Sequence, residues 1–270
     1  MDEMSLRAEE SIRNTFHREL FEPFTKACRE YRLIEDGDRI AVCISGGKDS
    51  MLLAKLFQEI QRHKKAEFDL RFIAMDPGYD QANADLIKSN ARKLGIPLES
   101  FKSNVFEEAD KAVKGKCYIC ARKRRGHLYS KARELGCNKI ALGHHYDDVI
   151  ETILMGMLYG GQIQTMLPRL KSRNYEGMEL IRPMYLIREE AICRWRDLNG
   201  LVFLDCACSV TDRKTEDTSK RLEIKKLIAE LKETNPAVEA NIFKSVENID
   251  LDSVIGYKKD GKRSSFLDEF

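Results

Sequence analysis

Short apolar runs alternate with helical patterns along most of the chain. Such runs, typical of strands, cover residues 39–44, 70–75, 139–142 and 180–184, and the short extended segment 98–101 is a further strand candidate. Segments with apolar residues at helical spacing follow them, from residue 51 and over 81–94, 119–135, 149–158 and 188–198. Strands that alternate with helices of this length are joined by right-handed crossovers. The pattern therefore predicts an α/β fold with a doubly wound, mainly parallel sheet.

Further helical patterns flank the predicted sheet. Residues 6–31 carry apolar positions at helical spacing that Pro23 interrupts, which predicts one kinked or two short helices. Two more helices are expected over residues 217–233 and 236–248, and the last twenty residues read as a polar tail with little core. The expected organisation is an N-terminal helical segment (1–32), a central α/β domain (33–208), C-terminal helices (209–250) and a tail (251–270).

A glycine-rich turn joins the first buried strand to the next helix. It reads Ser45-Gly46-Gly47-Lys48-Asp49-Ser50. Glycine lets the backbone approach a ligand closely, and the turn amides together with the helix N-terminus favour an anion. Lys48 adds a positive charge, and Asp49 is a candidate magnesium ligand. The sequence therefore predicts a phosphate-binding loop.

The order of residues excludes a Walker A loop. That motif needs a glycine five positions before its Gly-Lys-Ser/Thr, and Val42 stands at that place. Aspartate rather than serine or threonine also follows Lys48. The turn instead resembles the pyrophosphate-binding loop of the N-type ATP pyrophosphatases, in which a substrate oxygen attacks the α-phosphate of ATP.

Polar residues stand at the ends of three predicted strands. Ser45, Asp76 and His144 each follow a strand, and ligands of open α/β sheets bind at the carboxyl ends of the strands. The segment from Gly143 continues through His145 and Tyr146 to Asp147 and Asp148. One aspartate suffices to cap the following helix, which leaves the other for magnesium or for orienting the reacting group.

Four of the eight cysteines form a second candidate site. Cys117 and Cys120 have the CxxC spacing of two ligands for one zinc ion or iron–sulfur cluster, and Cys206-Ala207-Cys208 offers one or two more. The spacing alone leaves the metal undecided. The remaining four lie in apolar periodic patterns and are expected in the core: Cys28, Cys43, Cys137 and Cys193.

Composition narrows the class of protein. In 270 residues, hydrophobic residues make up 43%, which suffices for a real core, and the net charge of +2 says little about partners. No run of about 18 apolar residues and no apolar leader is present, so we expect a cytosolic protein without a membrane partner. A disulfide framework is then not expected, which favours the metal reading of the paired cysteines.

Positive charge is concentrated beside the CxxC pair. Arg122, Lys123, Arg124 and Arg125 follow Cys120 directly, and further Lys and Arg residues lie at positions 111, 114, 116, 131 and 133. Such a run is ordinarily a solvated helix face. Its density here makes an RNA phosphate backbone a plausible partner.

Several motifs in order resemble the two-thiocytidine synthetase family of tRNA-thiolating enzymes. The resemblance covers roughly residues 29–208. Its motifs are residues 33–39 (LIEDGDR), 45–50 (SGGKDS), 117–122 (CYICAR), 124–126 (RRG) with 128–129 (LY), 139–145 (KIALGHH) with Asp147 and Asp148, and 157–161 (MLYGG).

This resemblance implies a PP-loop ATPase fold of the adenine nucleotide alpha hydrolase type and a two-step reaction. ATP would adenylate the C2 oxygen of a cytidine in the tRNA anticodon loop, and sulfur would then displace AMP. A [4Fe–4S] cluster with three cysteine ligands is implied, with Zn²⁺ as the alternative occupant. By position these ligands are Cys117, Cys120 and Cys208, with Cys206 as substitute, because this chain has CxC where the family has a CxxC-type segment.

The resemblance also implies roles for individual residues and partners. Lys48, Asp49, Asp147 and Asp148 would be catalytic, with Asp49 and Asp148 holding Mg²⁺, and the run 122–125 would bind tRNA. A sulfur donor such as a cysteine desulfurase and a homodimer are expected as further partners. The residues expected to bind ATP are Ser45, Gly46, Gly47, Lys48, Asp49, Ser50, Met75, Asp76, Gly143 and His144.

Three other interpretations fit part of the sequence. A lysidine-synthetase-like ligase would share the loop and the His-His-Asp-Asp type of segment, but it has no need of a CxxC pair. A related thiolase or desulfurase would act on another nucleoside. A zinc-stabilised RNA-binding protein would explain the cysteines and basic helix, yet it leaves the paired aspartates and the intact loop without a purpose.

Overall fold

The computed structural model describes residues 3–64, 66–105, 116–204 and 216–269, with the backbone alone for 116–118, 216–219 and 269. The chain forms two compact units. The first comprises Met1–Val149 and Met166–Arg221, and the second comprises Ile150–Thr165 and Leu222–Phe270. The four-part division expected from the sequence stays a prediction.

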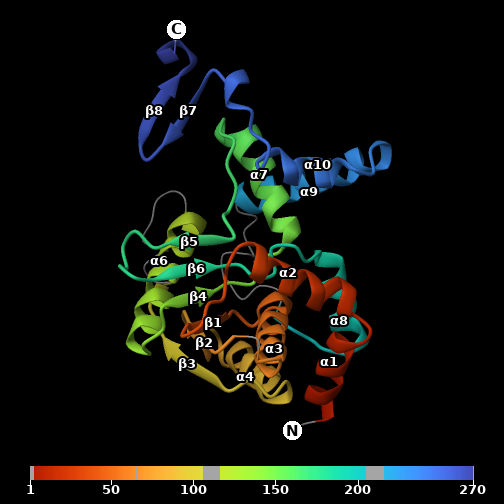
Figure 1. The fold of residues 1–270 in the computed structure, drawn as a ribbon. Coiled ribbons are helices and arrows are strands. Elements are labelled where there is room, and N and C mark those ends of the chain that lie inside the picture. Colours follow the sequence, from red (N-terminus) through yellow and green to blue (C-terminus); the bar gives the residue numbers. More distant parts are fainter. Residues whose placement is uncertain (1–2, 65, 106–115, 205–215, 270) are drawn as a thin grey trace. The chain divides into compact units, whose positions relative to one another are not determined.

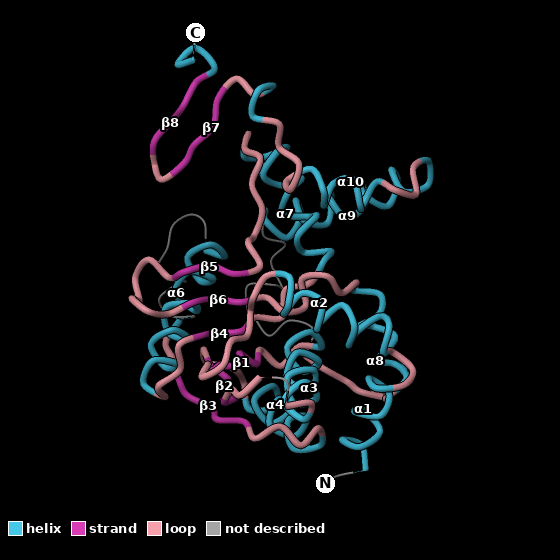
Figure 2. Tube along the Cα trace, viewed as in Figure 1, coloured by secondary structure: helices cyan, strands magenta, loops and turns pink. Residues whose placement is uncertain are grey.

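A six-stranded sheet forms the centre of the first unit, in the order β3-β2-β1-β4-β6-β5 (Figures 1 and 2). All neighbours pair in parallel except β5, which runs antiparallel to β6 at the edge. The doubly wound, mainly parallel fold is thereby confirmed. The strands are β1 (Arg39–Ile44), β2 (Asp69–Asp76), β3 (Leu98–Lys102), β4 (Lys139–Ala141), β5 (Arg169–Lys171) and β6 (Glu179–Ile181).

Helices connect the strands and continue beyond them. In chain order they are α1 (Glu3–Arg13), α2 (Glu22–Glu30), α3 (Lys48–Arg62), α4 (Gln81–Lys93), α6 (Lys116–Glu134), α7 (Tyr146–Gly160), α8 (Glu189–Leu198), α9 (Glu216–Thr234) and α10 (Val238–Ser245). Most bounds agree with the sequence patterns to within a few residues. α7 differs by starting at Tyr146, so that the paired aspartates lie in its first turn.

The two faces of the sheet bury different helices. On one face Ala41 and Cys43 of β1 pack with Ile73 of β2 against Tyr129 and Ala132 of α6. Alternation along a strand places the other side chains of β1 on the opposite face, where α3 packs (Figure 1). This burial on both faces explains why β1 reads as an unbroken apolar run.

The N-terminal helical segment is broken into three pieces. α1 is followed by a π-helical turn, His17–Phe21, and then by α2. Pro23 lies in the first turn of α2, where its missing N–H costs no helical hydrogen bond. The expected interruption at Pro23 therefore occurs as a helix start.

The edge of the sheet beyond β4 differs from expectation. The strand expected at 180–184 ends at Ile181, and Arg182 instead donates its N–H to the carbonyl of Pro168. β5 was not predicted, because its three residues show no apolar alternation and lie in a basic segment.

The second unit contains most of α7, most of α9, α10, a 3₁₀ turn (Leu251–Ser253), the hairpin β7 (Gly256–Lys259) and β8 (Lys262–Ser265), and a 3₁₀ turn (Phe266–Glu269). The hairpin was missed in the tail. Its turn residues Asp260 and Gly261 both have positive φ, +50° and +79°, and Asp-Gly is a typical signal for such a turn. Among the helices that the structure describes, none is long and apolar enough to cross a membrane.

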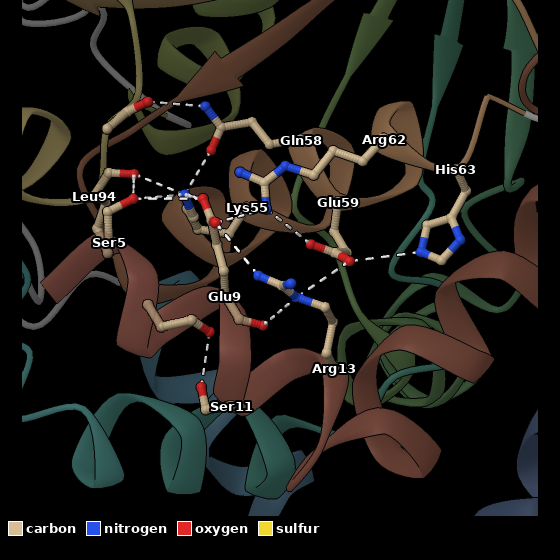
Figure 3. Close-up of polar contacts among 12 residues, drawn as sticks. Ser5, Glu9, Ser11, Arg13, Lys55, Gln58, Glu59, Arg62, His63 and Leu94 are labelled. Atoms are coloured by element: carbon tan, nitrogen blue, oxygen red, sulfur yellow. Dashed lines mark hydrogen bonds and ion pairs between the residues drawn. The ribbon is translucent and has the colours of Figure 1, made fainter. Parts of the chain in front are cut away.

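A buried polar network anchors α3, the helix that follows the phosphate loop (Figure 3). Lys55 is fully buried, and its Nζ donates to Glu9 Oε1 (2.6 Å), Gln58 Oε1 (2.7 Å) and the carbonyl of Leu94 (2.8 Å). Glu9 also accepts from Arg62 at 2.6 Å. Burial alone would raise the pKa of Glu9, but Arg62 and Lys55 outweigh that effect and lower it. The network ties α1 and the end of α4 to α3.

Replacing Lys55 tests this anchoring. Lys55→Met leaves the buried Glu9 carboxylate without one of its two 2.6 Å donors, so we expect the free energy of unfolding to fall by about 3–5 kcal/mol. Lys26→Met, at an exposed position of α2, should stay within about 0.5 kcal/mol of the unsubstituted protein. Urea unfolding followed by circular dichroism measures both, and a loss below about 1 kcal/mol for Lys55→Met would contradict the anchoring role.

Candidate functional site

The loop between β1 and α3 is closed by its two serines. The N–H of Ser45 donates to Ser50 Oγ (3.1 Å), and Ser50 Oγ donates to the carbonyl of Gly47 (2.9 Å). The hydroxyls thus shape the loop. The first N–H groups of α3 have no partner inside the helix, and they offer an anion both hydrogen bonds and the positive end of the helix dipole.

Gly46 is required by geometry. Its φ is +92°, and a Cβ built on it would lie 2.5 Å from Cγ1 of Ile87 on α4. Gly47 has an ordinary φ of −79° and more room, with the carbonyl oxygen of Leu204 at 3.5 Å from such a Cβ. Only the first glycine is therefore demanded by the folded backbone itself.

Lys48 is held beside the loop by two carboxylates. Its Nζ lies 3.0 Å from Glu189 Oε1 on α8 and 3.2 Å from Asp49 Oδ1. Burial opposes the charge of Lys48, but Asp49 and Glu189 outweigh that effect and raise its pKa. The side chain stays positively charged. An anion at the loop would compete with Glu189 for it.

Asp148 lies in the first turn of α7. Its Oδ2 accepts from the N–H of His145 at 3.1 Å, which caps the helix, and its Oδ1 accepts from Arg221 at 2.7 Å. Burial opposes its charge, but His145, His144 and Arg221 outweigh it and lower the pKa of Asp148. Asp148 is therefore ionised and combines a capping role with a place at the site.

Asp147 points to a different part of the molecule. Its Oδ2 accepts the N–H of Glu189 (2.7 Å), and its Oδ1 accepts from Arg188 (2.9 Å). It thereby satisfies the first N–H of α8, a capping role that the side chain of the N-cap residue does not fill. Asp147 fixes the helix that carries Glu189, and its catalytic role stays a prediction.

His145 lies among three carboxylates. It is buried, and its Nε2 is 3.5 Å from Asp148 Oδ2 and 4.0 Å from Asp49 Oδ1, while its Nδ1 is 3.7 Å from Asp147 Oδ2. Asp49 Oδ1 is buried and makes no hydrogen bond. This histidine therefore brings the two expected magnesium ligands, Asp49 and Asp148, to one place.

A cavity of about 630 Å³ opens over these residues. The strand ends Ser45, Met75 and Gly143 line it, together with Asp49 and Asp148. Four arginines also line the cavity: Arg124, Arg125, Arg182 and Arg221. The excess of positive charge suits an anionic ligand.

His144 is a neutral hydrogen-bonding residue in this cavity. Its Nδ1 accepts from Arg182 Nε at 3.3 Å, which leaves Nε2 as the donor. Burial, and next the Arg182 charge, lower the pKa of His144 to about 4. Burial, and next Arg125, lower the pKa of Arg182 to about 10, so the guanidinium stays charged at neutral pH.

The second strand end supplies an apolar wall. Met75 lines both the main cavity and an adjacent one of about 180 Å³, which Ile87 and Phe101 also line. The Asp76 carboxylate accepts the N–H groups of Gly78 (3.0 Å) and Tyr79 (2.9 Å), so it shapes the turn after β2. Its expected ATP contact stays a prediction.

The basic run on α6 is divided between solvent and cavity. Arg122 and Lys123 are exposed, whereas Arg124 and Arg125 line the cavity. Arg124 also donates to the hydroxyl of Tyr79 at 2.9 Å. Two of the four expected tRNA-binding residues thus lie on the surface beside the site and two lie within it.

The cysteine site is described in part. Cys120 is half-buried in the first turns of α6, and the next residue, Ala121, lines the cavity. The side chain of Cys117 and all of Cys206 and Cys208 lie outside the described residues. The helix start that bears Cys120 therefore borders the cavity. Within the described residues, no three His, Cys, Asp or Glu side chains group to hold a metal ion.

The other cysteines behave as expected with one exception. Cys28, Cys43 and Cys137 are buried, whereas Cys193 on α8 is half-buried. Cys43 lines the cavity, but burial raises the pKa of its thiol. It is therefore poorly suited to act as a thiolate.

Comparison with known proteins decides the family. The family model of the PP-loop domain matches residues 13–214. A tRNA-cytidine(32) 2-sulfurtransferase of Geobacter sulfurreducens is 35% identical over 243 residues, which cover 89% of this chain and 93% of that protein. The chain belongs to the PP-loop family of tRNA-cytidine(32) 2-sulfurtransferases. The resemblance seen in the motifs is confirmed.

Further relatives agree with this 2-sulfurtransferase assignment. The enzyme of the same name from Syntrophotalea carbinolica is 34% identical over 227 residues, covering 83% of this chain and 86% of its own. The U34-tRNA thiolase of Methanococcus maripaludis, solved with its [4Fe–4S] cluster, superposes with a TM-score of 0.66 at 20% identity and covers 85% of this chain and 79% of that chain. This likeness extends the fold to a solved structure.

Sequence reasoning missed several residues of the site. Arg182, Glu189 and Arg221 were not expected there. Arg182 carried a usable signal, because it is a charged residue inside an apolar run expected to be buried. Glu189 contacts Lys48 and Arg221 contacts Asp148, and no local pattern reveals either contact.

Alanine at the two loop glycines tests the backbone requirement. Gly46→Ala should lower the free energy of unfolding by at least about 1–3 kcal/mol, because the residue must adopt a left-handed φ and displace Ile87. Gly47→Ala is the matched control and should cost less than about 1 kcal/mol. Thermal unfolding compares the two, and equal losses would contradict the distinction drawn between them.

His144 should make stability pH-dependent. Its pKa is about 4 in the folded protein against an ordinary 6.5, so between these values only the unfolded chain takes up a proton and stability falls as pH falls. His144→Asn keeps an acceptor near the Nδ1 position and cannot titrate. Between pH 7.5 and 5 it should lose about 1–2 kcal/mol less than the unsubstituted protein. Urea titrations at both pH values measure this, and parallel losses would refute it.

Proposed function

We propose that this chain is an ATP-dependent tRNA sulfurtransferase that replaces the C2 oxygen of cytidine 32 with sulfur. The carrying observation is that one cavity brings together Ser45, Asp49 and Ser50 of the SGGKDS loop, the carboxylate of Asp148, and the helix start that bears Cys120. An activating site and a sulfur site would thus share one substrate. Family membership and the names of the relatives support the same activity.

In the first step the loop would hold the terminal pyrophosphate of ATP. The N–H groups at the start of α3 donate to its oxygens, and Lys48 turns from Glu189 towards it. The cytidine C2 oxygen attacks the α-phosphorus, an O–P bond forms, and the bond to pyrophosphate breaks with its electron pair on the leaving group. Met75 and the apolar cavity beside it would take the adenosine.

Asp49 and Asp148 would hold Mg²⁺ together with phosphate oxygens and water. The buried Oδ1 of Asp49 supports this, since it makes no hydrogen bond and already has a cation, Lys48 Nζ, at 3.2 Å. Two protein carboxylates are a common magnesium complement when phosphates supply the other ligands. His145 would keep both carboxylates in place.

In the second step sulfur adds to the activated C2 carbon and AMP leaves with the electron pair of the C2–O bond. Cys117, Cys120 and Cys208, with Cys206 as substitute, would hold a [4Fe–4S] cluster, which supplies an iron site to carry the sulfur; Zn²⁺ is the alternative occupant. Cys43, although it lines the cavity, would stay protonated and take no part.

The exposed Arg122 and Lys123 would bind the tRNA backbone, while Arg124 and Arg125 reach the nucleotide in the cavity. We propose the cytoplasm as the site of this reaction, because tRNA and ATP are both present there. A cysteine desulfurase as sulfur donor and a homodimer remain predictions from the sequence.

Nucleoside analysis tests the proposed function. tRNA from cells that lack this protein should contain cytidine where cells that produce it contain 2-thiocytidine, as measured by mass spectrometry of the digested tRNA. Anaerobically purified protein should be brown, with about four irons for a [4Fe–4S] cluster. Unchanged 2-thiocytidine in the cells that lack the protein would refute the assignment.

Asp49→Ala tests the activating half alone. Release of AMP in the presence of tRNA and a sulfur source should fall by about a hundredfold or more. The reason is that Mg²⁺ loses a protein ligand and no longer stabilises the charge on the leaving pyrophosphate. The iron content should not change. Asp69→Ala, an exposed carboxylate at the opposite end of the sheet, is the matched control. Normal AMP release from Asp49→Ala would remove this residue from the mechanism.

A further inference from the structure

Arg182 is a buried cation whose hydrogen bonds are incompletely used. It lies directly after β6 and is 5% exposed. Its Nε donates to His144 Nδ1 at 3.3 Å, and its Nη1 donates to the carbonyl of Leu167. Within the part of the chain that the structure describes, Nη2 has no protein acceptor and no carboxylate forms an ion pair with the guanidinium. The side chain lines the main cavity.

The burial of this charge requires a counterpart. Removing a guanidinium from water is costly unless an anion or several acceptors replace the water. Both carboxylates that line this cavity have other partners: Asp148 accepts from Arg221 at 2.7 Å, and Asp49 lies 3.2 Å from Lys48 Nζ. Two neutral acceptors, His144 and Leu167, orient the guanidinium. The cavity side of Arg182 is therefore suited to an anionic ligand.

The position of Arg182 separates it from the pyrophosphate loop. Ser45 follows β1, His144 follows β4 and Arg182 follows β6, and these three strands are neighbours in the sheet. With strands about 4.8 Å apart, the loop and Arg182 are separated by roughly 10 Å at the sheet edge. An anion beside Arg182 would therefore be a different group from one that the loop amides hold.

We propose that Arg182, oriented by His144, is a second phosphate-binding residue of the cavity that takes a phosphate group outside the pyrophosphate loop. This rests on the proposed function. Two phosphates of that reaction qualify: the α-phosphate of the nucleotide, which leaves as AMP, and a phosphodiester beside the target cytidine. Both present oxygens to a forked guanidinium in the same way.

Ligand binding tests the proposal without turnover. The unsubstituted protein, Arg182→Gln and Arg182→Lys are titrated with AMP, adenosine, pyrophosphate and a tRNA anticodon stem–loop. Loss of a charge-assisted hydrogen bond should weaken the binding of AMP or of the stem–loop, whichever supplies the phosphate, by about tenfold to a hundredfold. Arg39→Gln, an exposed arginine at the other end of the sheet, is the matched control and should change nothing.

The outcomes separate the two sources. Weaker AMP binding with adenosine and pyrophosphate unchanged assigns the α-phosphate, and weaker stem–loop binding alone assigns a phosphodiester. If every affinity is unchanged, or if adenosine is weakened as much as AMP, the proposal is wrong. Should Arg182→Gln fail to fold, as shown by lost pyrophosphate binding, Arg182→Lys decides, because it keeps the charge but removes the fork.

Variants of His144 test whether this residue orients Arg182. His144→Asn keeps an acceptor for Arg182 and should retain AMP or stem–loop affinity within about threefold, whereas His144→Phe removes the acceptor and should weaken it by about tenfold. Equal affinities in both variants would overturn the positioning role. These assays measure binding alone, so a protein that discriminates AMP from adenosine through Arg182 but thiolates no tRNA would refute the proposed function and leave this inference standing.

Discussion

The turn from β1 into α3 is the constraint on which the site depends. The chain leaves a strand buried on both faces and enters a helix within three residues, so Gly46 adopts a φ of +92° against Ile87. Ser45 and Ser50 close that turn. The first N–H groups of α3 then lie at the carboxyl end of β1, where they are suited to bind an anion.

Charged groups fix α3 and α8, the two helices whose side chains surround the loop. Lys55, two turns along α3, is fixed by Glu9 and the end of α4, so the helix cannot shift without burying unpaired charge. Asp147 fixes the start of α8, from which Glu189 reaches Lys48. Rigid support of this kind keeps the donors of the loop in position before the ligand arrives.

The carboxylates and arginines of the cavity have different partners. Asp148 serves the helix cap and Arg221, and Asp49 keeps an unsatisfied oxygen. Arg182 forms no ion pair with either carboxylate and donates instead to a neutral histidine. The site thus offers one place to a cation and another to an anion. A reaction in which negative charge develops on a leaving pyrophosphate requires both a cation site and an anion site.

Local patterns determined much of this protein from the sequence alone. Unbroken apolar runs identified the buried strands, glycines marked the loop, and strand-end residues such as Ser45 and His144 were placed correctly because parallel strands end at one edge. The roles of Arg182, Glu189 and Arg221 were decided only by tertiary structure, as was the diversion of Asp147 to α8. Their partners are distant in sequence, and a charged side chain carries no local sign of whether it meets solvent, a helix end or a ligand.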